Sequence, residues 1–169
     1  MCGNPKGCAR GLGFATKARD MRLIPPAWAL GIGIGQRSLA TALGRHDYPG
    51  RRALASTLGI AGAGVMTTAV WQFWRARTTF DPIAPHRASS LVTTGLYSRS
   101  RNPIYIADVL VLAAHAAWLG QPLALLGIPA LVAALHPQIR AEETALQERF
   151  GREYDAYVAR IPRWVGPRG

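Results

Sequence analysis

An uncharged stretch of 22 residues, Ala53–Trp74, constrains the fold more than any other feature of the chain. As an α-helix it would be roughly 33 Å long, enough to cross the hydrocarbon core of a bilayer. Arginines flank it on both sides, and two tryptophans lie in its last turn, as in the aromatic belts of membrane proteins. The stretch therefore predicts a transmembrane helix. Its residues Ala55, Gly59 and Ala63, spaced by four, predict a small-residue seam for close helix packing.

Three further segments predict the rest of a helical bundle. Ile24–Leu43 is apolar apart from one glutamine and one arginine, and we expect it to be the first span. A Gly-Gln-Pro step divides the next apolar block into Pro103–Leu119 and Pro122–His136, which predicts a helical hairpin. In Gln138–Ile161 apolar residues recur at helical spacing with charges opposite, which is typical of an amphipathic helix lying on a membrane. The predicted fold class is all-α: an integral membrane helical bundle of about four spans plus a C-terminal amphipathic helix.

The charge of the chain points to lipid rather than to nucleic acid. The net charge is +11, although 49% of the 169 residues are hydrophobic. The basic residues lie between the apolar segments rather than along one helix face, and no nucleic-acid-binding motif is present. Anionic lipid headgroups are therefore the expected partners. The only cysteines, Cys2 and Cys8, have no Cys/His cluster around them, so neither a disulfide framework nor a metal site is expected.

The first 20 residues differ from the rest of the chain. They are basic and glycine-rich, and they lack the apolar core of a signal peptide. Met21 opens a segment that is typical of the start of a membrane protein. We therefore expect residues 1–20 to be a disordered extension or a mis-assigned start, and residues 21–169 to form one membrane domain.

The distribution of arginines predicts an orientation in the membrane. The tip of the predicted hairpin carries no lysine or arginine, whereas the segment 75–102 and the C-terminal tail are rich in arginine. By the positive-inside rule the tip is non-cytoplasmic, and the two basic segments face the cytoplasm. The loop Gly44–Arg52, with three arginines, is an exception to this rule if the chain has four spans.

The motif "RNP" at 101–103 is the first candidate for chemistry. Asn102 is a favoured helix N-cap and Pro103 is favoured at the first helical position, so a helix is expected to begin there. Free backbone N–H groups at that point, reinforced by Arg99 and Arg101, suit a carboxylate or a phosphate. A plain helix start with arginines that anchor it to lipid is the simpler explanation of these residues taken alone.

A pair of glutamates in "IRAEETAL" is the second candidate. Glu143 lies on the apolar stripe of the last predicted helix, and Glu142 lies at its edge. Two carboxylates turned toward an apolar layer are costly unless they bind something. The partner is either a ligand or an arginine of the segment 75–102, which would make a structural ion pair. Arg140 fits either arrangement.

Other polar residues near these motifs leave alternatives open. Asp108, one turn into the first hairpin arm, either approaches a site or reaches interfacial water, and the sequence favours water. His115 lies deeper and is expected to be a hydrogen-bonded core histidine. Tyr97 and Tyr105 flank the "RNP" motif, where they would lie at the membrane interface or stack on a ligand.

Four pieces of the chain together form a more specific pattern. "TTFDP", "LVTTGLYSRSRNPIY", "EETALQERFGREYDAY" and "RIPRW" occur in this order between Met21 and Trp164. This pattern resembles the isoprenylcysteine carboxyl methyltransferase family and the wider group that includes phospholipid amine methyltransferases. The resemblance implies an integral membrane enzyme of bacterial type that uses S-adenosylmethionine. It also implies a cofactor-binding part at about 91–164, facing the cytoplasm at the inner membrane.

The resemblance also implies roles for individual residues. The positions that match the family's cofactor-binding motifs are Thr93, Gly95, Tyr97, Arg101, Asn102, Pro103, Tyr105, Glu142 and Glu143. Arg140, Glu142 and Glu143 are the implied catalytic residues. Methyl transfer from a sulfonium is an in-line displacement, so positioning does most of the work. A carboxylate acceptor needs no base, whereas an amine acceptor needs one, and either glutamate suits that role.

The sequence therefore predicts methyl transfer from S-adenosylmethionine to a lipidic or lipid-attached acceptor of the isoprenylcysteine carboxylate type. Three alternatives remain open at this point. The first is a phospholipid amine N-methyltransferase. The second is an NADPH-dependent membrane reductase, because a sterol-reductase-like group shares a similar C-terminal layout, with "RHPNY" where this chain has "RNPIY". The third is a non-catalytic membrane subunit.

Overall fold

The computed structural model describes residues 25–76 and 90–166 of the chain. In chain order these form α1 (Pro25–Leu43), α2 (Arg51–Arg75), the 3₁₀ helix η2 (Gly95–Ser98), α3 (Pro103–Leu119), the 3₁₀ helix η3 (Pro122–Leu126), α4 (Gly127–Phe150) and α5 (Arg152–Val158). The described residues contain no strand, so the all-α prediction is confirmed. The predicted N-terminal extension and the "TTFDP" piece lie outside the described residues.

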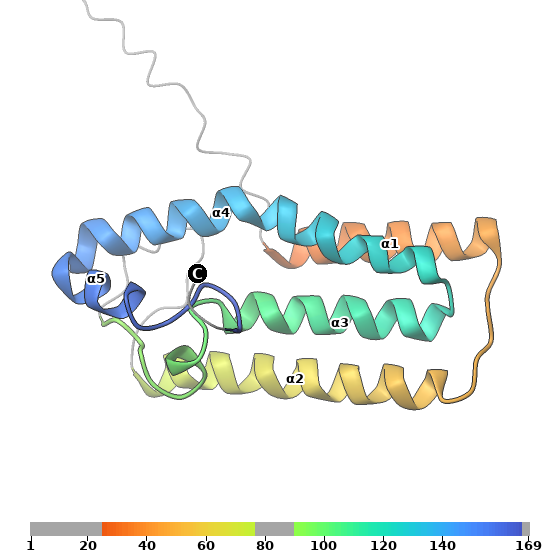
Figure 1. The fold of residues 1–169 in the computed structure, drawn as a ribbon, viewed down its shortest axis with the longest axis horizontal. Coiled ribbons are helices and arrows are strands. Elements are labelled where there is room, and N and C mark those ends of the chain that lie inside the picture. The colour runs from red at the N-terminus through yellow and green to blue at the C-terminus, as the bar shows by residue number, and fades with distance from the viewer. Residues whose placement is uncertain (1–24, 77–89, 167–169) are drawn as a thin grey trace, which may run out of the picture.

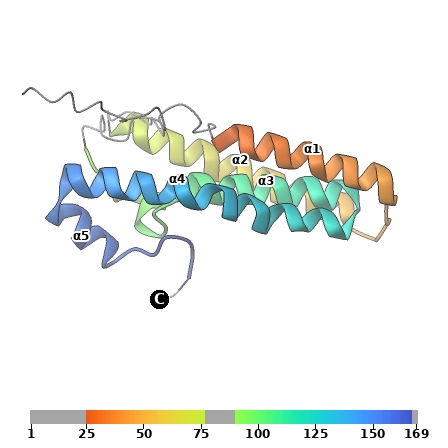
Figure 2. The same ribbon diagram turned by 90° about the horizontal axis from the view of Figure 1, so that it is seen from above.

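The four long helices lie side by side in an elongated bundle (Figure 1). The loop between α1 and α2 and the turn between α3 and η3 meet at one end, which we call the turn end. At the other end, the motif end, α4 extends beyond the start of α1 and leads into α5 (Figures 1 and 2). The C-terminal segment 161–166 folds back there beside the start of α3, so the predicted motifs gather at one end of the bundle.

The seam between α2 and α3 consists of small residues, but not all of the predicted ones. The buried apolar positions of α2 are Ala55, Gly62 and Ala69, which are seven residues apart, whereas Ala63 is exposed. A Cβ atom at Gly62 would lie 3.1 Å from a methyl of Val111 and 3.3 Å from a backbone carbonyl of α3. The prediction of a small-residue seam was therefore correct, but Ala63 is not part of it. Two helices packed along their length keep one face in contact every seven residues, so Gly62 rather than Ala63 lies at the contact.

The hairpin begins as predicted and continues differently. α3 has the predicted bounds, and Gly120 adopts a left-handed conformation (φ 66°) that ends it. The second arm starts later than predicted, because η3 comes before α4, and α4 then runs through Pro137 to Phe150. The predicted break before Gln138 is therefore wrong. Buried positions continue on one stripe across Pro137, so packing outweighs the lost backbone hydrogen bond. The helix ends instead at Gly151 (φ 51°).

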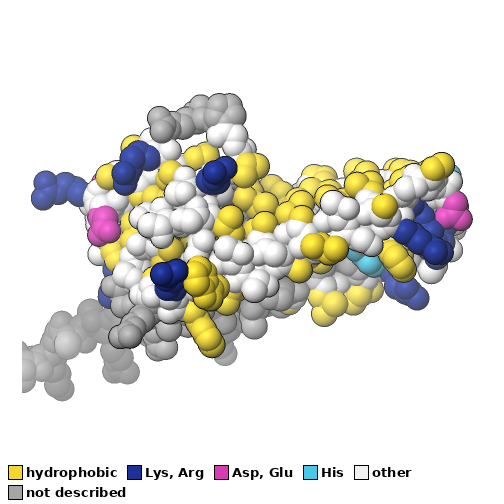
Figure 3. Space-filling model, turned by 90° about the horizontal axis from the view of Figure 1, so that it is seen from below, with side chains coloured by type: hydrophobic (Ala, Val, Ile, Leu, Met, Phe, Trp, Pro, Cys, Tyr) yellow, Lys and Arg dark blue, Asp and Glu magenta, His cyan; other side chains and the backbone are white. Residues whose placement is uncertain are grey.

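Two of the described helical segments are long and apolar enough to cross a membrane. They are α2, with 25 residues, and the continuous stretch Pro122–Phe150, with 29 residues. α3 is apolar but has 17 residues, so the number of four spans stays a prediction. Hydrophobic side chains cover the middle of the face shown in Figure 3, with basic side chains toward both ends. This is the surface pattern of a helical membrane protein.

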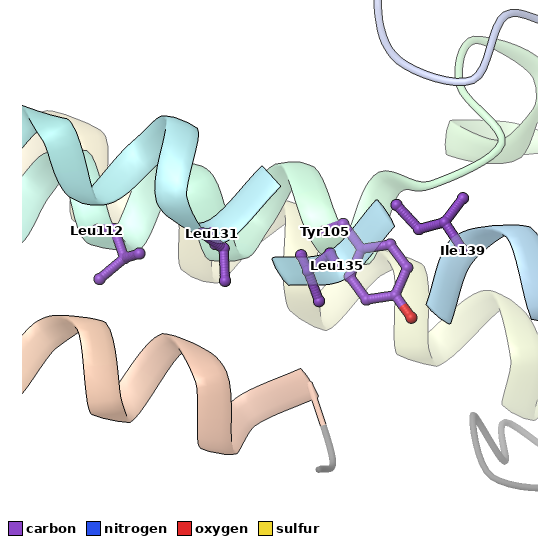
Figure 4. Packing of buried hydrophobic residues seen from close by; sticks show 5 residues of the cluster. All are labelled: Tyr105, Leu112, Leu131, Leu135 and Ile139. Carbon is purple, nitrogen blue, oxygen red and sulfur yellow. The ribbon is translucent and has the colours of Figure 1, made fainter. Parts of the chain in front are cut away.

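The main core lies between α3 and α4 and leads to the motif end. Its buried members are Tyr105, Leu112, Leu131, Leu135 and Ile139 (Figure 4). Residues of α1 and Trp164 of the C-terminal segment pack against this cluster. Because Tyr105 is the member nearest the start of α3, its ring connects the core to the "RNP" motif.

Polar contacts hold the other half of the bundle together. The Nε2 of Gln36 donates to the carbonyl of Ala124 (2.8 Å), and its Oε1 lies 2.8 Å from Nδ1 of His115. His115 is therefore hydrogen-bonded, as predicted. At the turn end, the backbone N–H of His46 donates to the carbonyl of Gly120 (2.7 Å). Arg51, which is buried, donates to the carbonyl of Trp118 and pairs with Asp47 (2.8 Å). That arginine of the Gly44–Arg52 loop thus caps the end of α3 instead of standing free.

Candidate cofactor site

The start of α3 is tied to the C-terminal segment. Pro103 is the first residue of the helix, as predicted, but the Asn102 side chain makes no N-cap hydrogen bond. Its Nδ2 donates instead to the carbonyl of Arg163 (3.0 Å), as does the hydroxyl of Ser100 (3.1 Å). The N–H of Arg101 donates to the carbonyl of Pro162 (3.0 Å). Asn102 thus occupies the N-cap position, as predicted, but its amide docks the C-terminal segment against the helix start instead of capping the helix.

An arginine cluster surrounds Glu143. Its Oε1 accepts hydrogen bonds from Nη1 of Arg101 (2.7 Å) and Nε of Arg163 (2.9 Å), and its Oε2 accepts from Nη2 of Arg163 (2.5 Å). The side chain of Arg101 is 13% exposed, that of Glu143 19% and that of Arg163 32%. The hydrogen bonds to the carboxylate raise the pKa of Arg163. The predicted ion pair between a glutamate and an arginine of the segment 75–102 is therefore present, and an arginine of the "RIPRW" piece joins it.

Glu142 faces a second cluster, next to the first. Its Oε1 accepts hydrogen bonds from the hydroxyl of Tyr105 (2.6 Å) and from Nε2 of Gln138 (3.1 Å). Gln138 lies one turn earlier on α4 and is buried. Both glutamates thus point toward α3, as their position on the apolar stripe predicted. Together they connect the middle of α4 to both the start of α3 and the C-terminal segment.

Tyrosines of α5 close the motif end. Tyr154 and Tyr157 are buried, and the hydroxyl of Tyr157 donates to the carbonyl of Tyr97 (2.7 Å). Burial raises the pKa of both α5 tyrosines. A hydrogen bond between Tyr154 and Arg101 opposes this effect on the pKa of Tyr154. α5 therefore packs over η2 and the start of α3.

Several predicted residues lie on the α2 side of this end. Tyr97 is buried in a small cluster with Ala69, Val92 and Ile104, and its ring packs edge-on against Phe73 (5.1 Å between centroids). Gly95 has φ 63°, and a Cβ there would lie 2.1 Å from the Gln72 side chain, so the glycine lets η2 approach α2 closely. This placement explains the glycine structurally. Its cofactor role stays a prediction.

The other predicted residues divide into two groups. Arg101, Asn102, Pro103, Tyr105, Glu142 and Glu143 are brought together at the motif end. Thr93 is half-buried near η2, and Arg140 is exposed. Within residues 25–76 and 90–166, no ion pair includes Arg140. Sequence reasoning missed Ser100, Gln138, Tyr154 and Arg163 as neighbours of these residues, although the "RIPRW" piece that contains Arg163 was part of the recognised pattern.

Asp108 is buried rather than open to interfacial water. Asp108 is 8% exposed, and its Oδ2 has no hydrogen-bond partner in the described part of the chain. The expectation of a water-facing Asp108 is therefore wrong, because the helix face that carries it packs inward. Arg101 has a matching feature, since its buried Nε also lacks a partner there.

The comparisons with known proteins identify the family. The family model for phospholipid methyltransferases matches residues 51–153, a range that runs from α2 into α5 and contains every predicted site residue. The chain belongs to the phospholipid methyltransferase family. The family is one of membrane methyltransferases that typically use S-adenosylmethionine. The resemblance to the isoprenylcysteine and phospholipid methyltransferase group is thereby confirmed.

Two curated relatives and the solved structures complete the comparison. An uncharacterized protein of Haemophilus influenzae is 38% identical over 63 residues, which are 37% of this chain and all of that protein. The nickel-cobalt-cadmium resistance protein NccN of Alcaligenes xylosoxydans xylosoxydans is 29% identical over 136 residues, which are 80% of this chain and 61% of NccN. No solved structure matches the chain. Among the residues described here, no group of three or more His, Cys, Asp or Glu side chains could hold a metal ion.

Proposed function

We propose that the chain transfers a methyl group from S-adenosylmethionine to a lipidic or lipid-attached acceptor. The proposed location is the cytoplasmic face of a bacterial inner membrane. The observation that carries the proposal is the convergence of three distant segments at one end of the bundle. The start of α3, the two glutamates of α4 and the C-terminal segment meet there through Arg101, Glu143 and Arg163.

The donor set at this end fits the cofactor. S-adenosylmethionine carries a carboxylate, an ammonium and a sulfonium, so its site needs both hydrogen-bond donors and carboxylates. The buried Nε of Arg101 is a donor without a partner, and the buried Oδ2 of Asp108 is an acceptor without one. The carboxylates of Glu143 and Glu142 lie at the same end of the bundle, in contact with Arg101 and Tyr105 respectively. When bound, the cofactor would supply an electrophilic methyl group on its sulfonium sulfur.

The residues of the chain then have separable tasks. Arg101 and Arg163 hold the Glu143 carboxylate and position the C-terminal segment over the helix start. Glu142, hydrogen-bonded by Tyr105, is the proposed base for an amine acceptor. A carboxylate acceptor would require no proton transfer. Exposed apolar side chains on the membrane-facing helices allow a lipid-attached acceptor to lie against the bundle.

Equilibrium binding to the purified chain in detergent tests the cofactor. We expect S-adenosylmethionine to bind in the micromolar range without competition from NADPH. Arg101→Ala should weaken binding by about tenfold or more, because a hydrogen bond to a charged group is worth roughly 1.5–3 kcal/mol. Arg99→Ala, which removes an exposed arginine two residues before Arg101, is the matched control and should have no effect. A folded chain that binds NADPH instead, or binds neither, would contradict the proposal.

The stability of the methylated product distinguishes the two acceptor classes. Membrane vesicles that contain the chain are incubated with methyl-labelled S-adenosylmethionine, and lipid-linked label is extracted. A methyl ester on a carboxylate releases labelled methanol in mild base, whereas an N-methyl group is stable. Base-labile label supports an isoprenylcysteine-like acceptor, and base-stable label supports a phospholipid amine. No label above that of vesicles lacking the chain would contradict methyl transfer to lipid.

A further inference from the structure

A buried carboxylate lies one turn into α3 with nothing in the described chain to compensate it. Asp108 is 8% exposed, and its Oδ2 has no hydrogen-bond partner among the described residues. Among the described residues, no ion pair includes Asp108. A carboxylate in an apolar layer is among the most costly groups to bury without a partner. The arrangement therefore calls for a cationic partner that the described chain does not supply.

The position of Asp108 places it on the wall that carries the candidate site. Tyr105, Asp108 and Leu112 lie at i, i+3 and i+7 on α3, so they share one face of the helix. That face packs on α4, because Tyr105 hydrogen-bonds to Glu142 and Leu112 shares a core with Leu131 (Figure 4). Asp108 thus lies between Tyr105 and Leu112 along α3, further into the helix than Arg101.

The charges along this wall have a definite order. At the outer end are Arg101 and Arg163 around Glu143, with the unpartnered Nε of Arg101. Next come Tyr105 and Glu142, and deepest is the unpartnered Oδ2 of Asp108. A ligand that fits this order has an anionic group at its outer end and a cationic group at its inner end. The carboxylate and the sulfonium of S-adenosylmethionine lie at opposite ends of its methionine chain.

We infer that Asp108 is the counter-ion for the sulfonium of bound S-adenosylmethionine, while Arg101 receives the cofactor's carboxylate. This inference rests on the proposed function. The orientation places the methyl group toward the apolar part of the bundle, where a lipid-attached acceptor lies. The opposite orientation would turn the methyl group toward the aqueous end and away from such an acceptor.

This assignment gives Asp108 a role in specificity. Methyl transfer leaves the carbon–sulfur bonding pair on sulfur, so the product S-adenosylhomocysteine is a neutral thioether. A carboxylate beside the sulfur therefore favours the cationic cofactor over the product. The ammonium of the methionine chain is common to both molecules, so a carboxylate beside that group would not discriminate between them.

The test compares binding of S-adenosylmethionine, S-adenosylhomocysteine and sinefungin, which has an amine-bearing carbon in place of the sulfonium. Titration calorimetry is performed on the full chain in detergent. We expect the wild-type chain to bind S-adenosylmethionine more tightly than S-adenosylhomocysteine. Asp108→Asn should weaken the two cationic ligands by about tenfold and leave S-adenosylhomocysteine unchanged. Asp155→Asn, which changes an exposed aspartate of α5, is the matched control and should alter none of the three.

Three outcomes would overturn the inference. In Asp108→Asn protein that unfolds like the wild-type chain, the binding of S-adenosylmethionine and of S-adenosylhomocysteine is weakened equally, or neither binding affinity changes. If the variant does not fold, the wild-type comparison decides, and tighter binding of the product than of the cofactor overturns the inference. If the folded wild-type chain binds neither ligand, the proposed function itself fails. That result is distinct, because every outcome that overturns only the inference requires the wild-type chain to bind at least one of the two ligands.

Discussion

Replacing Glu143 by glutamine is a direct test of the arginine cluster. The substitution keeps the shape of the side chain and removes the charge that joins Arg101 to Arg163, both of which are less than a third exposed. Removing one partner of a fully buried ion pair costs roughly 3–5 kcal/mol, whereas an exposed pair is worth at most about 1 kcal/mol. The intermediate burial here predicts a loss of about 2 kcal/mol in the free energy of unfolding.

Two readouts follow from that loss. The unfolding midpoint of the purified chain in detergent should fall by roughly 5 °C. Trypsin should cleave after Arg163 faster, because the carboxylate no longer holds that side chain. Glu148→Gln changes an exposed glutamate of the same helix and should alter neither readout. If Glu143→Gln unfolds at the wild-type temperature and is cleaved at the wild-type rate, the cluster does not hold the C-terminal segment and the reasoning is refuted.

Three further predictions follow from packing, burial and orientation. Gly62→Leu should destabilise the chain by about 1–3 kcal/mol, because the new side chain meets α3. Gly64→Leu is the control and should not destabilise the chain, because a Cβ there meets nothing within 4 Å. Equal unfolding midpoints for the two variants would contradict this packing. Burial raises the pKa of Tyr97. The contribution of this raised pKa to the free energy of unfolding is therefore complete below about pH 10, the pKa of an unfolded tyrosine, and is lost as the pH rises further. The fall in unfolding midpoint from pH 9 to 11 should be smaller in Tyr97→Phe than in the wild-type chain. In a cysteine-free background, Tyr48→Cys at the turn end should react with impermeant maleimide on intact cells, and Val165→Cys at the motif end only after lysis; the reverse would invert the orientation.

Features set by neighbouring residues were predictable from the sequence. Proline lacks an N–H group and favours the first helical turn, so the start of α3 at Pro103 follows from one residue. Its end follows from Gly120, which adopts a left-handed conformation at no steric cost. The length and apolar character of α2 likewise predicted a possible span before any packing was known. In each case the controlling residues lie within the element or directly beside it.

Features set by distant contacts were not predictable in the same way. Asn102 has the residue type of an N-cap, yet its amide binds the carbonyl of Arg163, which is 61 residues away along the chain. Pro137 predicts a break by the local rule, and the continuous buried stripe of α4 overrides that rule. The burial of Asp108 depends on which face of α3 packs against α4, and periodicity in an almost wholly apolar helix does not reveal that face. The site is assembled by the fold-back of the C-terminal segment, so its composition was visible in the sequence but its geometry was not.

That fold-back predicts that binding at the proposed site orders the C-terminal segment. The segment is held by the carbonyls of Pro162 and Arg163 on the start of α3 and by the ion pair to Glu143. Arg101 takes part in both sets of contacts and is also the proposed ligand of the cofactor's carboxylate. A ligand that binds only the closed form stabilises it by about 2.7 kcal/mol at a concentration 100 times its Kd.

Cofactor should therefore protect the C-terminal segment from protease. When cleavage proceeds through a rapid opening of the segment, S-adenosylmethionine at that concentration should slow trypsin cleavage after Arg163 by about 100-fold. Cleavage after Arg45 in the loop at the turn end provides an internal control, because that loop contacts the hairpin turn and not the site. In Arg101→Ala, with a Kd about tenfold higher, the protection at the same ligand concentration should fall from about 100-fold to about tenfold or less. If calorimetry shows binding while cleavage after Arg163 keeps its rate, the segment opens independently of the ligand, and the proposed site lies elsewhere than beneath it.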